Sequence, residues 1–159
     1  MAIEHLARKL GSRLKEKEYK LVTAESCTGG GIAFAITQIE GCSDWFERGF
    51  VTYSNESKQE LLGIEANLLT LHGAVSEAVA LAMAQGALMH SHADVSISVT
   101  GVAGPGGGTP EKPVGTIWLG LAGPSFTTQA IPLSLQGNRQ QIREQTIFLA
   151  LEKCLALLK

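Results

Sequence analysis

The sequence predicts an α/β fold, specifically a three-layer α/β/α sandwich around a mixed β-sheet. Strand-like and helix-like segments alternate through the first two thirds of the chain, and this alternation is typical of parallel strands joined by helical crossovers. The strands expected after residue 113 have no helix between them, so we expect them to pair antiparallel. With 159 residues, 45% of them hydrophobic, the chain can bury one substantial core. We therefore expect one domain over residues 1–159.

The first predicted elements are a helix and then a strand–turn–helix unit. The helix is indicated by apolar residues at helical spacing, namely Ile3, Leu6, Ala7, Leu10 and Leu14. Lys20–Ala24 is a short strand candidate that continues directly into the segment Glu25–Gly31. A helix is expected to follow this segment and to end at about Gln38.

The sequence in the middle of the chain predicts one strand followed by three helices. Gly49–Tyr53 is rich in aromatic and β-branched residues, which is typical of a strand. Helices are expected from Asn55 onward, over Glu65–Leu71, and from Ser76 to about His90. Glycines in the turns separate these helices.

The last third predicts three strands and a closing helix. Asp94–Thr100 and Val114–Leu121 are strand candidates, and Phe126–Leu133 is expected at an edge of the sheet. The closing helix is expected over Asn138–Leu158. The longest irregular segment is the loop Gly104–Pro113, and its length inside a compact domain points to function.

The composition disfavours several classes of protein. The net charge is −2, so nucleic acid and anionic membranes are poor candidate partners. No segment approaches the roughly 20 apolar residues that span a bilayer, and no signal peptide is evident, so we expect the protein in the cytoplasm. Cys27, Cys42 and Cys154 lie at unrelated spacings, which predicts reduced thiols rather than a disulfide framework. We expect neither a metal nor a cofactor.

The segment Glu25–Gly31 is the most informative motif. Its three consecutive glycines each disfavour a helix by about 1 kcal/mol relative to alanine, so something must offset that cost. Close approach of a ligand to bare main-chain amides at the start of the helix would do so, and Ser26 lies beside those amides. The alternative is that Ser26 or Thr28 caps the helix and that the glycines allow tight packing.

A hydroxyl nucleophile needs a base, and no histidine stands beside a convincing acid in the sequence. The segment Thr52–Lys58 follows a strand, where α/β folds place ligand-contacting residues, so Tyr53, Asn55 and Lys58 could share a site. Burial near a helix N-terminus would lower the pKa of Lys58 and make it a neutral base toward Ser26, directly or through Tyr53. The alternative is a solvated lysine, with Asn55 as an ordinary N-cap.

A glycine-rich loop, Thr100–Gly108, follows a predicted strand and is a candidate to hold a phosphate or ribose. It does not match a Walker A loop, so ATP receives little support. Arg139 and Arg143 open the last helix, and either could bind a phosphate in a bidentate manner. The alternatives are a flexible surface turn and two ordinary exposed arginines.

Five ordered blocks together resemble the CinA C-terminal domain family over nearly the whole chain. The blocks are Ala24–Gly30, Gly49–Asn55 with Lys58, His72–Ser76, Thr100–Pro105 and Lys112–Thr116. A stand-alone domain of this length resembles the PncC type within the family. The resemblance implies an α/β/α sandwich that converts nicotinamide mononucleotide to nicotinic acid mononucleotide and ammonia in pyridine nucleotide recycling, without a metal.

The resemblance also implies roles for individual residues. Ser26 would be the nucleophile, and Lys58 and Tyr53 would be its proton-transfer partners. Main-chain amides would form an oxyanion hole at Thr28, Gly29 and Gly30. The remaining candidates for binding the nucleotide are Asn55, Thr100, Gly101, Gly104 and Arg139.

Two other functions stay open. One is a non-catalytic domain that binds a nucleotide or a partner, linked to competence or DNA damage, although the intact set of Ser26, Tyr53 and Lys58 argues against it. The other is a related amidase that acts on a different small amide. The apolar residues on the predicted helices also suggest a homo-oligomer, most simply a dimer.

Overall fold

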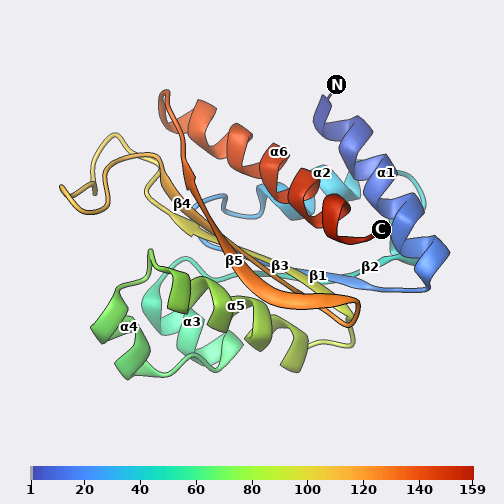
Figure 1. The fold of residues 1–159 in the computed structure, drawn as a ribbon, viewed down its shortest axis with the longest axis horizontal. Coiled ribbons are helices and arrows are strands. Elements are labelled where there is room, and N and C mark those ends of the chain that lie inside the picture. Colours follow the sequence, from blue (N-terminus) through green and yellow to red (C-terminus); the bar gives the residue numbers. More distant parts are fainter. Residues whose placement is uncertain (1) are drawn as a thin grey trace.

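The computed structural model describes residues 2–159. Its elements along the chain are α1 (Ala2–Lys17), β1 (Leu21–Glu25), α2 (Gly31–Thr37), the 3₁₀ helix η1 (Cys42–Asp44), β2 (Phe46–Val51), α3 (Asn55–Leu62), α4 (Ala66–His72), α5 (Glu77–Met89), β3 (Val95–Gly101), β4 (Thr116–Gly123), β5 (Phe126–Ser134) and α6 (Arg139–Leu157). One sheet lies between two layers of helices (Figure 1). The predicted three-layer α/β/α sandwich is therefore confirmed.

The strand order in the sheet is β2-β1-β3-β4-β5. β1 pairs parallel with both β2 and β3, whereas β3 pairs antiparallel with β4, and β4 with β5. This arrangement confirms the mixed sheet, the antiparallel late strands and the edge position of β5. β2 begins at Phe46, earlier than the predicted Gly49, because Phe46 already pairs with Leu21 at the start of β1.

The two faces of the sheet are covered by different helices. α1, α2 and α6 lie on one face, and α3, α4 and α5 lie on the other (Figure 1). β3 shows the consequence along one strand: Val95, Ile97 and Val99 face the core beneath the first layer. The alternate residues Ser96 and Ser98 face α5 and donate hydrogen bonds to carbonyl oxygens of that helix, at 2.8 and 2.7 Å.

Small side chains allow α5 to lie close to the sheet. Gly120 of β4 stands opposite Ser98, and a Cβ atom at this glycine would lie 2.4 Å from the carbonyl oxygen of Ala80 and 2.2 Å from Ser98 Oγ. Both contacts are too short for a real side chain. The distance between the sheet and α5 therefore depends on a glycine at this position.

Among residues 2–159, no helix combines the length and the hydropathy needed to cross a membrane.

Replacing Gly120 with alanine tests this packing. Because the added methyl group would collide with the main chain of α5, we expect Gly120→Ala to lower the free energy of unfolding by about 1–3 kcal/mol. Gly106→Ala is the matched control, since a Cβ there meets no atom within 4 Å. Urea denaturation measures both, and equal midpoints for the two variants would contradict the packing argument.

Candidate active site

The candidate residues gather at one end of the sheet, where the parallel strands have their carboxyl ends. Ser26 directly follows β1, Tyr53 lies two residues after the end of β2, and Gly101 is the last residue of β3. These three strands are parallel, so their carboxyl ends meet at the same edge. Ligands of open α/β sheets bind outside these ends. The loop between β3 and β4 extends from the sheet at this edge (Figure 1).

The loop that carries Ser26 has a fixed conformation. The Ser26 amide donates to the Val99 carbonyl of β3 at 3.0 Å, and the Gly29 amide donates to the Ser26 carbonyl at 3.0 Å. Gly29 and Gly30 have φ angles of 57° and 96°, in the left-handed region that favours glycine. The glycines are therefore needed for the turn itself, in addition to any contact with a ligand.

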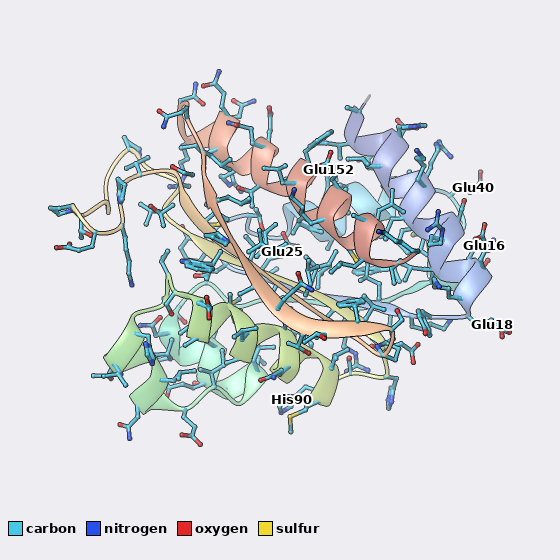
Figure 2. All side chains as sticks on the ribbon, viewed as in Figure 1. Glu16, Glu18, Glu25, Glu40, His90 and Glu152 are labelled. Atoms are coloured by element: carbon cyan, nitrogen blue, oxygen red, sulfur yellow. The ribbon has the colours of Figure 1, made fainter. Side chains whose placement is uncertain are left out.

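Glu25 anchors this loop from inside the protein. Its side chain is 1% exposed, and Figure 2 shows it in the interior, whereas Glu16, Glu18 and Glu40 lie at the surface. The carboxylate accepts hydrogen bonds from Thr28 Oγ1 at 2.5 Å and from the amides of Ile32 and Ala33 at 2.8 and 3.0 Å. Glu25 thus occupies the Ile32 and Ala33 amides in the first turn of α2, so amides open to a ligand have to come from the loop before the helix.

Lys58 lies within hydrogen-bonding distance of Ser26. α3 begins after Ser54, whose hydroxyl accepts from the Ser57 amide as an N-cap, and Lys58 on its first turn is 1% exposed. The Lys58 Nζ atom lies 3.1 Å from Ser26 Oγ, 3.0 Å from the Thr52 carbonyl oxygen and 3.1 Å from the Tyr53 carbonyl oxygen. The structure therefore brings together the predicted nucleophile and the predicted base.

The surroundings of Lys58 favour its neutral form. Among residues 2–159, no carboxylate lies within ion-pair distance of its Nζ atom. Burial lowers the pKa of Lys58 below its ordinary value, because desolvation disfavours the ammonium form. A neutral amine can donate two N–H bonds to the Thr52 and Tyr53 carbonyls and keep its lone pair for the Ser26 hydroxyl proton. A role for Lys58 as general base stays a prediction, and this geometry is compatible with it.

Cys27, the neighbour of Ser26, is not suited to be the nucleophile. Its side chain is 5% exposed and belongs to the core beneath α1, α2 and α6. Burial raises the pKa of the Cys27 thiol to about 12, and the thiolate is the reactive form. The Ser26 hydroxyl is therefore the candidate nucleophile in this loop.

Several main-chain amides of the loop are available to a ligand. Among residues 2–159, the N–H groups of Cys27, Thr28 and Gly30 have no hydrogen-bond acceptor. The Gly29 amide is engaged by the Ser26 carbonyl. An oxyanion hole among Thr28, Gly29 and Gly30 stays a prediction, and the free amides favour Thr28 and Gly30 for it.

Tyr53, Gly104 and Arg139 meet at the rim of the site. The Tyr53 side chain is 60% exposed, and its hydroxyl accepts a hydrogen bond from Arg139 Nη2 at 3.1 Å. Arg139 Nη1 donates to the Gly104 carbonyl at 2.7 Å. Tyr53 thus contacts the Ser26–Lys58 pair only through its main-chain carbonyl. Asn55 is exposed at the start of α3, and the residue that caps this helix is Ser54.

Thr100 and Gly101 have contacts within the protein. The Thr100 hydroxyl donates to the Ala74 carbonyl at 2.9 Å, and its side chain is 1% exposed. A Cβ atom at Gly101 would lie 2.2 Å from Ile117 Cδ1. Their side-chain positions are therefore explained by packing, and a role in binding a nucleotide stays a prediction.

Sequence reasoning assigned no role to Glu25, and for Arg143 it offered only a bidentate contact to a phosphate. Arg143 donates to the carbonyl oxygens of Cys27 and Thr28, at 3.1 Å each. Residues four apart lie on one face of a helix, so Arg143 shares a face with Arg139, and that spacing was the available signal. For Glu25, the signal was a carboxylate at the end of an otherwise uncharged strand.

The chain is similar to proteins of one family along almost its whole length. A family model described as the CinA C-terminal domain matches residues 3–158. A protein from Enterobacter agglomerans named nicotinamide-nucleotide amidohydrolase PncC is 48% identical over 153 residues, which cover 96% of this chain and 93% of that protein. A CinA-like protein from Syntrophobacter fumaroxidans is 44% identical, and the match covers 93% of this chain but 35% of that longer protein.

A solved structure has nearly the same fold. The crystal structure of the competence/damage inducible protein CihA from Agrobacterium tumefaciens superposes with a TM-score of 0.97 at 43% sequence identity. The superposition covers 100% of this chain and 97% of that chain.

The pH dependence of stability tests the state of Lys58. Since the pKa of Lys58 is lowered from 10.5 by folding, the unfolded chain binds more protons between the lowered pKa and 10.5. The free energy of unfolding should therefore gain up to about 1.4 kcal/mol per pH unit from this group as pH rises through that window. Lys58→Met lacks the group, so the stability of wild type relative to this variant should increase as pH rises from the lowered pKa toward 10.5. A difference that stays constant in urea denaturation would contradict a lowered pKa.

Proposed function

The chain belongs to the CinA C-terminal domain family, and on that premise we propose that it deamidates nicotinamide mononucleotide with Ser26 as nucleophile. The observation that carries this proposal is the 3.1 Å distance between Ser26 Oγ and the Nζ atom of a buried lysine that forms no ion pair with a carboxylate among residues 2–159. The name of the Enterobacter agglomerans relative supports the substrate. A hydroxyl activated by an amine base is suited to acyl transfer from an amide.

The first half of the reaction forms an acyl-enzyme. Neutral Lys58 takes the proton of the Ser26 hydroxyl as Oγ bonds to the carboxamide carbon of the substrate. The resulting oxyanion is stabilised by the free amides of Thr28 and Gly30. The tetrahedral intermediate collapses as the C–N bond breaks, and the protonated Lys58 gives its proton to the departing ammonia. An ester between Ser26 and the nicotinoyl group remains.

The second half releases the acid with the same residues. Lys58, again neutral, takes a proton from a water molecule whose oxygen attacks the ester carbonyl. Collapse of the second tetrahedral intermediate breaks the bond to Ser26 Oγ, which recovers its proton from Lys58. The sum is one water consumed, with one carboxylic acid and one ammonia produced, which exchange a proton in solution to give carboxylate and ammonium.

We assign nucleotide binding to the rim of the site. Arg139 is exposed, and its guanidinium already joins Tyr53 to the loop at Gly104. A guanidinium is well suited to a phosphate group, so Arg139 is the proposed phosphate ligand. The amides and side chains of Asn55, Thr100 and the following loop are proposed to surround the ribose.

The setting of the reaction is also part of the proposal. We expect one catalytic domain over residues 1–159, acting in the cytoplasm in pyridine nucleotide recycling. Its three cysteines form no disulfide, which suits a reducing compartment. A homodimer stays a prediction, supported by exposed apolar side chains such as Phe34 and Met89.

Ammonia release from nicotinamide mononucleotide tests the proposed function. With EDTA present, wild type should turn over, Ser26→Ala should lose at least about 10³-fold in kcat, and Lys58→Met at least about 10²-fold. Wild-type activity should also fall as pH decreases through the lowered pKa of Lys58, since protonation removes the base. Ser43→Ala, an exposed serine in η1 at the other end of β2, is the matched control and should keep full activity.

The outcome of this assay distinguishes a serine amidohydrolase from a domain that only binds a nucleotide. Turnover lost only in the Ser26 and Lys58 variants supports the serine amidohydrolase. If folded wild type releases no ammonia but binds the mononucleotide in calorimetry, the chain is a nucleotide-binding domain. Turnover that survives Ser26→Ala would refute the covalent mechanism.

Tyr53→Phe separates the two possible contributions of Tyr53. The Tyr53 carbonyl that contacts Lys58 is unchanged in this variant, whereas the hydroxyl held by Arg139 is lost. We expect kcat to fall by no more than about tenfold, since general acid–base groups contribute about 10²–10⁴-fold. A loss in kcat as large as that of Lys58→Met would instead place the hydroxyl in the proton-transfer path.

A further inference from the structure

We propose that Arg143 is a positioning residue that orients and polarises the oxyanion-binding amide of Thr28. The inference rests on the proposed function, because it concerns the same acyl transfer. Arg143 lies on α6, and the two loop residues that it contacts, Cys27 and Thr28, are 116 and 115 residues away in sequence. Its Nε atom donates to the Cys27 carbonyl at 3.1 Å, and its Nη2 atom donates to the Thr28 carbonyl at 3.1 Å.

The planar peptide bond transmits this contact to the site. In a trans peptide the carbonyl of one residue and the N–H of the next point in opposite directions. Because the Cys27 carbonyl points to Arg143, the Thr28 N–H points away from Arg143. The next peptide is held in the same way, but its Gly29 N–H is taken by the Ser26 carbonyl. The Thr28 amide is thus left fixed in direction and without an acceptor among residues 2–159.

The direction of the Thr28 N–H suits a role in binding the oxyanion. Arg143 belongs to the helix layer of α1, α2 and α6, whereas Lys58 belongs to the layer on the opposite face of the sheet (Figure 1). The Ser26 hydroxyl contacts Lys58. An N–H that points away from α6 therefore points away from the layer of Arg143, and we infer that it faces the side on which Ser26 contacts Lys58.

The charge of Arg143 also strengthens the amide as a donor. A hydrogen bond from a cation to the carbonyl draws electron density from the amide and makes its N–H more acidic. Arg143 is half-buried and lacks a carboxylate partner among residues 2–159, so its charge is not neutralised locally. The developing oxyanion receives this effect through one peptide group, while Arg143 itself touches no substrate atom.

The two arginines of α6 thus have different tasks. Arg139 is exposed at the rim and is assigned to the nucleotide, so its loss should raise KM. The Arg143 guanidinium donates to main-chain carbonyls of the loop that carries Ser26, so the loss of Arg143 should lower kcat. The guanidinium can lie close to this loop because residue 29 is a glycine. A Cβ atom there would lie 3.3 Å from Arg143 Nη2, which is tight.

Arg143→Met keeps the apolar stem and removes both donors. We expect kcat for the mononucleotide to fall about 10-fold or more, short of the 10²–10³-fold loss from deleting an oxyanion donor outright. KM should stay within about twofold, because ground-state contacts are unchanged. Arg143→Lys, which supplies a point charge without the fork of two donors, should lose less. Lys153→Met removes a charge ten residues further along α6 and should match wild type.

A fluorophosphonate probe gives a readout that does not depend on the mononucleotide. Ser26 Oγ bonds to phosphorus, fluoride leaves with the P–F bond, and Lys58 takes the hydroxyl proton, so labelling also needs the oxyanion-binding amide. Mass spectrometry should show slower labelling of Ser26 in Arg143→Met by about the same factor as kcat. Circular dichroism establishes that each variant is folded at the assay temperature.

The results separate the inference from the proposed function. Wild-type kcat and labelling rates in folded Arg143→Met would overturn the role of Arg143. A loss confined to KM would also overturn it and make Arg143 a substrate ligand. If wild type is labelled but does not release ammonia from the mononucleotide, the proposed substrate is wrong, and the labelling rates still decide the role of Arg143.

Discussion

The burial of one amine without a carboxylate partner is the constraint on which this site depends. Lys58 is 1% exposed, and an ammonium group there would be shielded from water with no carboxylate at ion-pair distance among residues 2–159, so the neutral form is favoured. Lys58 Nζ donates to two strand-end carbonyls and lies 3.1 Å from Ser26 Oγ; in the proposed mechanism the neutral amine turns its lone pair to the Ser26 hydroxyl. A surface lysine at the same position in sequence would stay charged near neutral pH and could not act as a base.

The nucleophile loop is held from both faces of the sheet. α3 brings Lys58 from one layer, and α6 brings Arg143 from the other. Glu25 anchors the loop through Thr28 and the first turn of α2, and the carbonyls of Ser26, Cys27 and Thr28 each accept a hydrogen bond within the protein. Such rigidity is what electrostatic stabilisation of a transition state needs, because the donors then require no reorganisation.

Much of this architecture is predictable from local sequence patterns. Alternating strands and helices predicted the sandwich, the missing crossovers predicted the antiparallel strands, and the segment after β2 pointed to Lys58. The roles of Glu25, Thr100 and Arg143 were not predictable in this way, because each depends on contacts between distant elements. Thr100 lay in a plausible ligand loop, yet its hydroxyl bonds to Ala74, 26 residues earlier. The periodicity of a sequence shows which residues share one face of a helix or strand, but it does not show which main-chain groups of other elements those residues contact.

The most direct test of this account is the pKa of Lys58 in the folded protein. Selective ¹³Cε labelling of lysine would follow its titration by NMR, and the absence of one resonance in Lys58→Met would identify the signal. We predict that the Lys58 resonance titrates below the ordinary value of 10.5. Titration of Lys58 at or above 10.5 would mean that the amine stays charged, and would remove the base on which the site depends.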